Sequence, residues 1–174
     1  MKFEIIRCSL SPTSRSDLLA QVAEEHARQA GLSVNSFSLK DHPLPFCDGG
    51  GAYGAQGVSA ISERVTTADG ILLSVPIYNY DVNAAAKNLL EMTGDGWTEK
   101  VVGFLCAAGG SGSYMSIMPF ANSLMLDYRS VIVPRFVYAT RADFEEAGEP
   151  SATIGERIGQ LVDTWSSMTR SLRG

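Results

Sequence analysis

The chain has 174 residues, of which 45% are hydrophobic and 19% are charged, and its formal net charge is −5 at pH 7. This length and apolar content predict one folded domain over residues 1–174 and exclude a disordered or collagen-like protein. The acidic balance argues against general nucleic-acid binding, because that binding depends on a basic face.

Targeting and metal-binding signals are missing from the sequence. No apolar run approaches the roughly 20 residues that cross a membrane, and the first residues, MKFEIIRCS, lack the apolar core of a signal peptide. We therefore expect a cytoplasmic protein that does not act at a membrane. The three cysteines and two histidines have neither disulfide-framework nor metal-ligand spacing, so no metal site is predicted.

Strands and helices alternate along the chain. Apolar runs bounded by turn residues predict strands over residues 3–8, 34–39, 70–76, 101–106 and 131–138. Apolar residues at helical spacing predict helices over residues 18–30, 58–68, 84–92, 114–128 and 154–168. The runs at 70–76 and 101–106 are almost wholly apolar, which is typical of strands buried on both faces. Pro134 cannot donate to a strand ladder, so the last strand is expected at an edge or with a bulge.

This alternation predicts a parallel sheet with helices on both faces. In such folds, ligands bind beyond the carboxyl ends of the strands, where the strand order reverses. The loops after the first, third and fourth strands are therefore the candidate binding segments. They read SLSPTSRS (9–16), PIYNYDVN (76–83) and AAGGSGS (107–113).

The first loop offers hydroxyl groups, Arg15 and the amides of a helix N-terminus, a set suited to a phosphate monoester. It lacks the glycine motifs that bind a dinucleotide pyrophosphate or a nucleoside triphosphate. A simpler interpretation is that its serines cap the following helix. The sequence alone leaves both interpretations open.

The other two loops suit a flat, hydrogen-bonding ligand. Tyr78 and Tyr80 offer aromatic contact, Asn79 offers a polar group, and the glycines from Gly109 let the backbone approach closely. Tyr78 could instead be a structural aromatic residue, and Asn79 a simple turn residue. A phosphate pocket beside a flat, polar pocket describes flavin mononucleotide (FMN).

At these loops the sequence resembles the NAD(P)H-dependent FMN reductases. The resemblance runs through SLSPTSRSDLL (9–19), VPIYNYDVNAAAKNLLEM (75–92) and AAGGSGS (107–113). It implies a flavodoxin-like three-layer α/β/α sandwich with a five-stranded parallel sheet in the order 2-1-3-4-5. It also implies FMN as cofactor, NADPH or NADH as reductant, a small-molecule electron acceptor and a homo-dimer or homo-tetramer. The chain departs from the family pattern at Tyr80 and Asp81, where the family usually has Gly or Ser after Asn.

The predicted FMN-binding residues follow from the three loops together with this resemblance. The phosphate is assigned to Ser9, Ser11, Ser14, Arg15 and Ser16. The ring is assigned to Pro76, Ile77, Tyr78 and Asn79 on one side and to Ala108, Gly109, Gly110, Ser111 and Gly112 on the other. No catalytic acid or base is assigned, because hydride transfer to a flavin depends on position and stacking, and the flavin carries the chemistry.

Three functions remain to be compared. The first is an NAD(P)H-dependent flavin reductase that passes electrons to a flavin, a quinone or a similar acceptor. The second is a flavodoxin-type electron carrier, which usually depends on a strongly acidic docking face. The third is a protein that keeps the fold and acts through partner contacts. The modest charge and short loops favour the reductase.

Overall fold

A parallel sheet forms the centre of the computed structural model, which describes residues 1–146 and 148–173. Ala147 and Gly174, within the predicted domain, lie outside the described residues. The main strands lie in the order β2 (Val34–Ser38), β1 (Phe3–Arg7), β3 (Gly70–Tyr78), β5 (Val101–Ala107) and β6 (Val131–Ile132). The short β7 (Val137–Ala139) also pairs with β5, in parallel. The predicted strand order is therefore confirmed.

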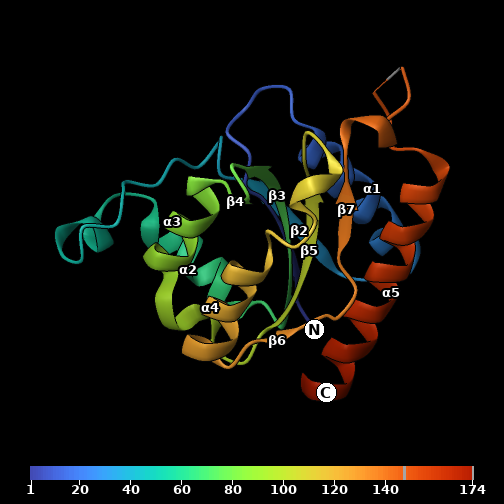
Figure 1. Cartoon of the computed structure of the whole chain (residues 1–174). Helices are drawn as coiled ribbons and strands as arrows, with labels where there is room; N and C mark the ends of the chain where they lie inside the picture. Colours follow the sequence, from blue (N-terminus) through green and yellow to red (C-terminus); the bar gives the residue numbers. More distant parts are fainter. Residues whose placement is uncertain (147, 174) are drawn as a thin grey trace.

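Helices cover both faces of the sheet. They are α1 (Arg15–Gln29), α2 (Val58–Thr67), α3 (Ala84–Thr93), α4 (Met118–Tyr128) and α5 (Ala152–Arg173). Figure 1 shows α1 and α5 on one face and α2, α3 and α4 on the other. Among the described residues, no helix is both long enough and apolar enough to cross a bilayer.

The two faces of the sheet each bury an apolar layer. Alternate residues of β3 point to opposite sides, so Leu72 joins the layer under α1 and α5 while Leu73 joins the layer under α2, α3 and α4. Trp165 of α5 is fully buried and meets Phe3 edge to face, with the ring centroids 4.8 Å apart. This two-sided burial explains why β3 and β5 are apolar at nearly every position.

Two predicted elements differ from the structure. The last strand, predicted over 131–138, is divided into β6 and β7, with Pro134 between them. Proline has no N–H to donate, so pairing with β5 stops and then resumes. The helix predicted from residue 114 begins at Met118, because residues Ser111–Ser113 form a separate 3₁₀ turn and Pro119 lies in the first turn of α4.

One short strand was not predicted. β4 (Asp81–Val82) folds back on the end of β3 and pairs with it antiparallel, with Tyr78 opposite Asp81. The second candidate loop is therefore a tight hairpin, which extends β3 beyond the edge of the parallel sheet.

Candidate functional site

The three candidate loops meet at the carboxyl edge of the sheet. They surround a cavity of about 1040 Å³. The predicted residues that line it are Ser9, Ser11, Ser14, Arg15, Ser16, Pro76, Ile77, Tyr78, Asn79, Ala108 and Gly109. Gly110, Ser111 and Gly112 lie next along the third loop, outside this lining. The fold thus brings together most of the residues selected from three distant segments.

The first loop forms a cluster of hydroxyl groups above β1. The Ser9 side chain is buried and its Oγ accepts the N–H of Ser11 at 3.2 Å. The hydroxyl groups of Ser14 and Ser16 lie 2.8 Å apart. These donors lie beside the first turn of α1, where free backbone N–H groups favour an anion.

Helix capping accounts for part of this loop. Ser14 has an extended backbone, and its Oγ accepts the N–H of Asp17 at 3.4 Å, as expected of an N-cap residue. The capping interpretation therefore applies to Ser14. It does not account for Ser9, Ser11 and Ser16, which line the same cavity.

Buried hydrogen bonds hold the first loop against β3 and its hairpin. The Ser74 hydroxyl donates to the carbonyl of Ser16 at 2.5 Å, and the Asn83 Nδ2 donates to the carbonyl of Cys8 at 2.7 Å. The backbone N–H of Asn83 also donates to the carbonyl of Pro76. Asn83 was not selected from the sequence, although a polar residue directly before an apolar helix was a usable signal.

The β3–β4 hairpin turns through two residues with positive φ. Asn79 has φ 51° and Tyr80 has φ 63°, the pattern of a two-residue turn that favours Asn and Gly. Tyr78, at the end of β3, is 56% exposed beside the cavity. A Cβ added at Gly112 would lie 3.3 Å from the Tyr80 hydroxyl, so the hairpin approaches the third loop closely.

The third loop is fixed by a tyrosine from β7. The Tyr138 hydroxyl donates to the carbonyl of Gly110 at 2.5 Å and lies 2.7 Å from the Ser113 Oγ. Space is open where a side chain would stand at Gly109. The backbone of this loop is thus held in place with one face accessible to a ligand. Tyr138 was missed in the sequence because strand position alone does not show what a side chain contacts.

Arginine and lysine residues also line the cavity. The Arg15 guanidinium lies over the Phe144 ring, 5.7 Å from its centroid. Arg7 and Lys40, which were not selected from the sequence, complete the cationic part of the lining. An anionic ligand therefore meets positive charge as well as neutral donors.

The donor set fits FMN. Serine hydroxyl groups, a helix N-terminus and Arg15 match a phosphate dianion. An exposed tyrosine, a hairpin and an open glycine backbone match a flat ring with polar edges. Among residues 1–146 and 148–173, no group of three or more potential metal ligands occurs.

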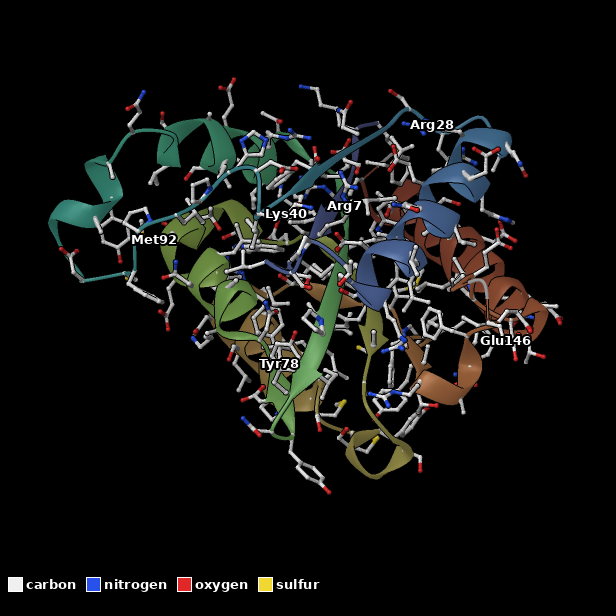
Figure 2. The ribbon with its side chains drawn as sticks, turned by 90° about the horizontal axis from the view of Figure 1, so that it is seen from above. Arg7, Arg28, Lys40, Tyr78, Met92 and Glu146 are labelled. Atoms are coloured by element: carbon white, nitrogen blue, oxygen red, sulfur yellow. The ribbon has the colours of Figure 1, made fainter. Side chains whose placement is uncertain are left out.

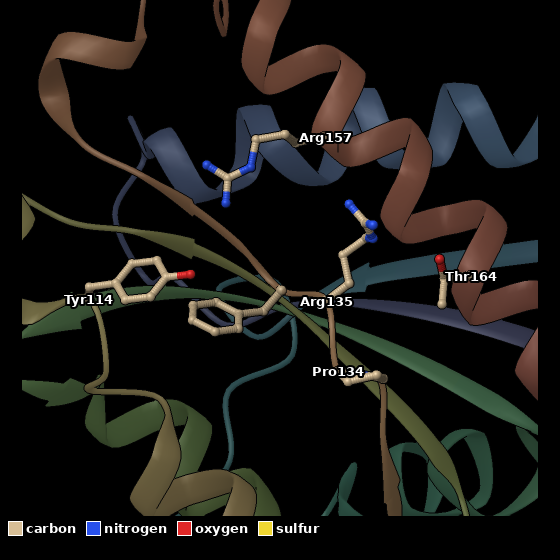
Figure 3. A pocket seen from close by; sticks show the side chains of 6 residues that line it. Tyr114, Pro134, Arg135, Arg157 and Thr164 are labelled. Carbon is tan, nitrogen blue, oxygen red and sulfur yellow. The ribbon is translucent and has the colours of Figure 1, made fainter.

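A second hollow of about 430 Å³ lies beside the break between β6 and β7. Figure 3 shows Tyr114 at one end and Thr164 at the other, with Arg135 and Arg157 between them. Arg135 Nη1 donates to Gln160 Oε1 at 2.6 Å. This hollow is lined by none of the predicted site residues.

Comparison with known proteins decides the family. Residues 1–143 match the model of the NADPH-dependent FMN reductases, a range that contains all three loops. The chain belongs to the NADPH-dependent FMN reductase family. It is accordingly an NAD(P)H-dependent oxidoreductase that uses FMN, and the flavodoxin-type carrier is not favoured.

Two curated relatives align over most of this FMN reductase. The NAD(P)H-dependent FAD/FMN reductase of Geobacillus thermodenitrificans is 28% identical over 167 residues, covering 93% of this chain and 90% of that enzyme. The FMN-dependent NADPH-azoreductase of Staphylococcus aureus is 26% identical over 170 residues, covering 92% of this chain and 88% of that enzyme.

Solved structures show the same fold. The flavoenzyme FerB, an NAD(P)H:acceptor oxidoreductase from Paracoccus denitrificans, superposes with a TM-score of 0.79 at 17% identity and covers 98% of both chains. The apo form of the NADH:FMN oxidoreductase EMOB superposes with a TM-score of 0.73 at 16% identity, covering 98% of this chain and 89% of that one. The flavodoxin-like fold implied by the sequence is therefore confirmed.

Proposed function

We propose that this FMN reductase binds FMN in the 1040 Å³ cavity and transfers a hydride to it from NADPH or NADH. Electrons then pass to a small-molecule acceptor such as a flavin, a quinone or an azo compound. The observation that carries the proposal is the meeting of a hydroxyl-rich helix N-terminus, an aromatic hairpin and an open glycine backbone around one cavity.

The residues of the chain are assigned to binding and orientation. Ser9, Ser11, Ser14, Arg15 and Ser16 hold the phosphate, and Pro76, Ile77, Tyr78 and Asn79 border the ring. Ala108, Gly109, Gly110, Ser111 and Gly112 flank its other edge, where backbone N–H groups favour negative charge on the reduced ring. When bound, FMN supplies the redox chemistry, while the protein supplies position and electrostatics.

The names of the relatives guide the choice of acceptor. One relative is named for FAD and FMN, and the other is named as an azoreductase. We carry both acceptor classes over to this protein as parts of the proposal. A single domain over residues 1–174, a homo-dimer or homo-tetramer and a cytoplasmic location also remain parts of it. NADPH and NADH oxidation with free FMN, a quinone and an azo dye tests the activity, and no oxidation with any acceptor would exclude it.

Arg15→Ala tests the phosphate assignment. Loss of a charge-assisted contact to phosphate weakens FMN binding by about tenfold to a hundredfold. Riboflavin lacks the phosphate, so its affinity should hardly change. Fluorescence titration of both flavins measures the two dissociation constants.

Arg28→Ala is the matched control, because Arg28 lies in the last turn of the same helix and pairs with Glu24. It should leave both affinities unchanged. An equal loss of FMN and riboflavin affinity in Arg15→Ala, or no loss of either, would remove the phosphate from this loop.

A further inference from the structure

The cavity continues past the first loop toward β2. Arg7 is the last residue of β1, and Lys40 follows the end of β2 by two residues. Arg7 pairs in register with Ser38, and its carbonyl accepts the N–H of Leu39 at 2.9 Å. Figure 2 shows Arg7 and Lys40 at the same part of the molecule, and both line the cavity.

The residues that line the cavity differ in charge from the protein as a whole. The chain has a net charge of −5, yet the described lining residues comprise three cations, Arg7, Arg15 and Lys40, and one carboxylate, Asp17. Within residues 1–146 and 148–173, neither Arg7 nor Lys40 forms an ion pair. Cations therefore outnumber carboxylates among the described lining residues, while Asp41, next to Lys40 in the chain, adds a carboxylate outside the lining.

Two polar atoms here are buried without a hydrogen-bond partner. They are Arg7 Nε and Asp17 Oδ1. Burial raises the pKa of the Asp17 carboxyl, with Asp41 acting in the same direction, while the positive charges of Arg7 and Lys40 oppose the rise. Asp17 thus interacts with the charges of both Arg7 and Lys40, and Lys40 is an exposed residue of the cavity lining.

The order of the strands places Lys40 beyond the phosphate loop. Along the edge of the sheet, the loops after β5 and β3 are those assigned to the ring, the loop after β1 is assigned to the phosphate, and Lys40 follows β2. FMN ends at its single phosphate. A ligand that extends further in the same direction must carry another group, and positive charge favours a second phosphate.

We propose that Arg7 and Lys40 form a second anionic subsite, which receives a phosphate group from the adenosine half of a dinucleotide bound in the cavity. The inference rests on the proposed function, since it extends the same flavin site. The phosphate has two sources, the adenylate phosphate of FAD and the 2′-phosphate that NADPH carries and NADH lacks. The cavity volume of about 1040 Å³ lies slightly above the range for ligand sites, about 300–1,000 Å³, as expected if more than FMN is accommodated.

Lys40→Gln is the primary test, because the exposed side chain can be neutralised without disturbing the core. Arg7→Gln is the second variant, and Arg170→Gln is the matched control on the exposed surface of α5. Dissociation constants for FMN, FAD and riboflavin are measured by fluorescence titration. KM values for NADPH and NADH are measured with free FMN as the acceptor.

If FAD is the source, Lys40→Gln weakens FAD binding by about tenfold and FMN binding by less than about threefold, as expected for a charge-assisted contact. If NADPH is the source, the same variant raises the KM for NADPH by a similar factor and leaves the KM for NADH nearly unchanged. Either result supports the subsite. Arg170→Gln should alter none of these values.

An unchanged FAD to FMN affinity ratio together with an unchanged NADPH to NADH preference in Lys40→Gln would overturn the subsite. So would an equal loss of FMN and FAD affinity, which would assign Lys40 to the first phosphate. Failure of the wild-type protein to bind FMN would instead remove the proposed function, so the two failures are distinguishable.

Discussion

At the scale of single residues, Tyr80 adopts a backbone conformation that its side chain disfavours. Its φ of 63° lies in the left-handed region, where a residue with a Cβ costs about 1–2 kcal/mol. Tyr80 is 70% exposed, so little apolar burial offsets the strain.

We therefore expect Tyr80→Gly to stabilise the protein by about 0.5–1 kcal/mol, after the larger chain entropy of glycine is subtracted. Urea unfolding measures the change. Tyr80→Ala keeps a Cβ and serves as the control, which should not be stabilised. A destabilised Tyr80→Gly variant would show that contact with the third loop outweighs the strain.

A second feature at the residue scale is a capping box in the turn after β7. The Asp143 carboxylate accepts hydrogen bonds from the backbone N–H and the hydroxyl of Thr140, both at 2.7 Å. This capping box directly precedes Phe144, the ring beneath Arg15. The hydrogen bonds from Thr140 hold the pKa of the Asp143 carboxyl below its usual value of 3.8.

We expect Asp143→Asn to lower stability at pH 7 by up to about 1 kcal/mol, the usual scale of a cap. Because the folded pKa is depressed, the stabilisation is present above pH 3.8 and is lost as the pH falls through the folded pKa. Urea unfolding of both proteins at pH 7 and at successively lower pH values below 3.8 measures the difference. A difference that persists at these lower pH values would contradict the role of the carboxylate.

At the scale of elements, helix α5 depends on a glycine at the start of β3. A Cβ added at Gly70 would lie 2.6 Å from Thr169 Oγ1 and 2.8 Å from Trp165 Nε1. Both side chains are fully buried, and the Trp165 indole N–H donates to the carbonyl of Val101 at 3.3 Å. The close approach of α5 to the sheet thus requires that no side chain be present at Gly70.

We expect Gly70→Ala to destabilise the protein by about 1–3 kcal/mol through overpacking. Gly155→Ala is the control. Gly155 lies in helix α5, and apart from the nearby backbone of that helix no atom lies within 4 Å of an added Cβ. That variant should gain up to about 1 kcal/mol from helix propensity. Thermal or urea unfolding compares the two, and equal effects would mean that space at Gly70 does not limit packing.

At the scale of the whole molecule, flavin binding should raise the free energy of unfolding and the Tm of the protein. A ligand that binds the folded state at 100 times its dissociation constant adds about 2.7 kcal/mol. For a protein of this size, that corresponds to an increase in Tm of about 5–10 °C. Riboflavin at the same concentration should raise Tm less, because it cannot occupy the phosphate loop.

Thermal unfolding with FMN, riboflavin and no ligand measures these shifts. The Arg15→Ala protein supplies the comparison, since its FMN shift should fall toward that of riboflavin. Equal shifts for the two flavins in the wild-type protein would contradict a phosphate contribution to binding.

Local patterns were sufficient to predict most of the fold. The apolar runs at 70–76 and 101–106 could be assigned to buried strands because apolarity at every position is needed where helices cover both faces. The three loops could be placed at one edge because parallel strands end on the same side. The same reasoning missed β4. A tight two-residue turn usually contains glycine, and the pair Asn79 and Tyr80 has none.

The sequence by itself determined which segments are buried and which loops share the ligand edge, since both follow from periodicity and chain order. Only the tertiary structure decided that Asn83 and Tyr138 fasten these loops, and that Arg7 and Lys40 face the same cavity. These roles depend on strand register and on side-chain direction in space. Both are set by packing between segments distant in the chain, and no local pattern encodes them.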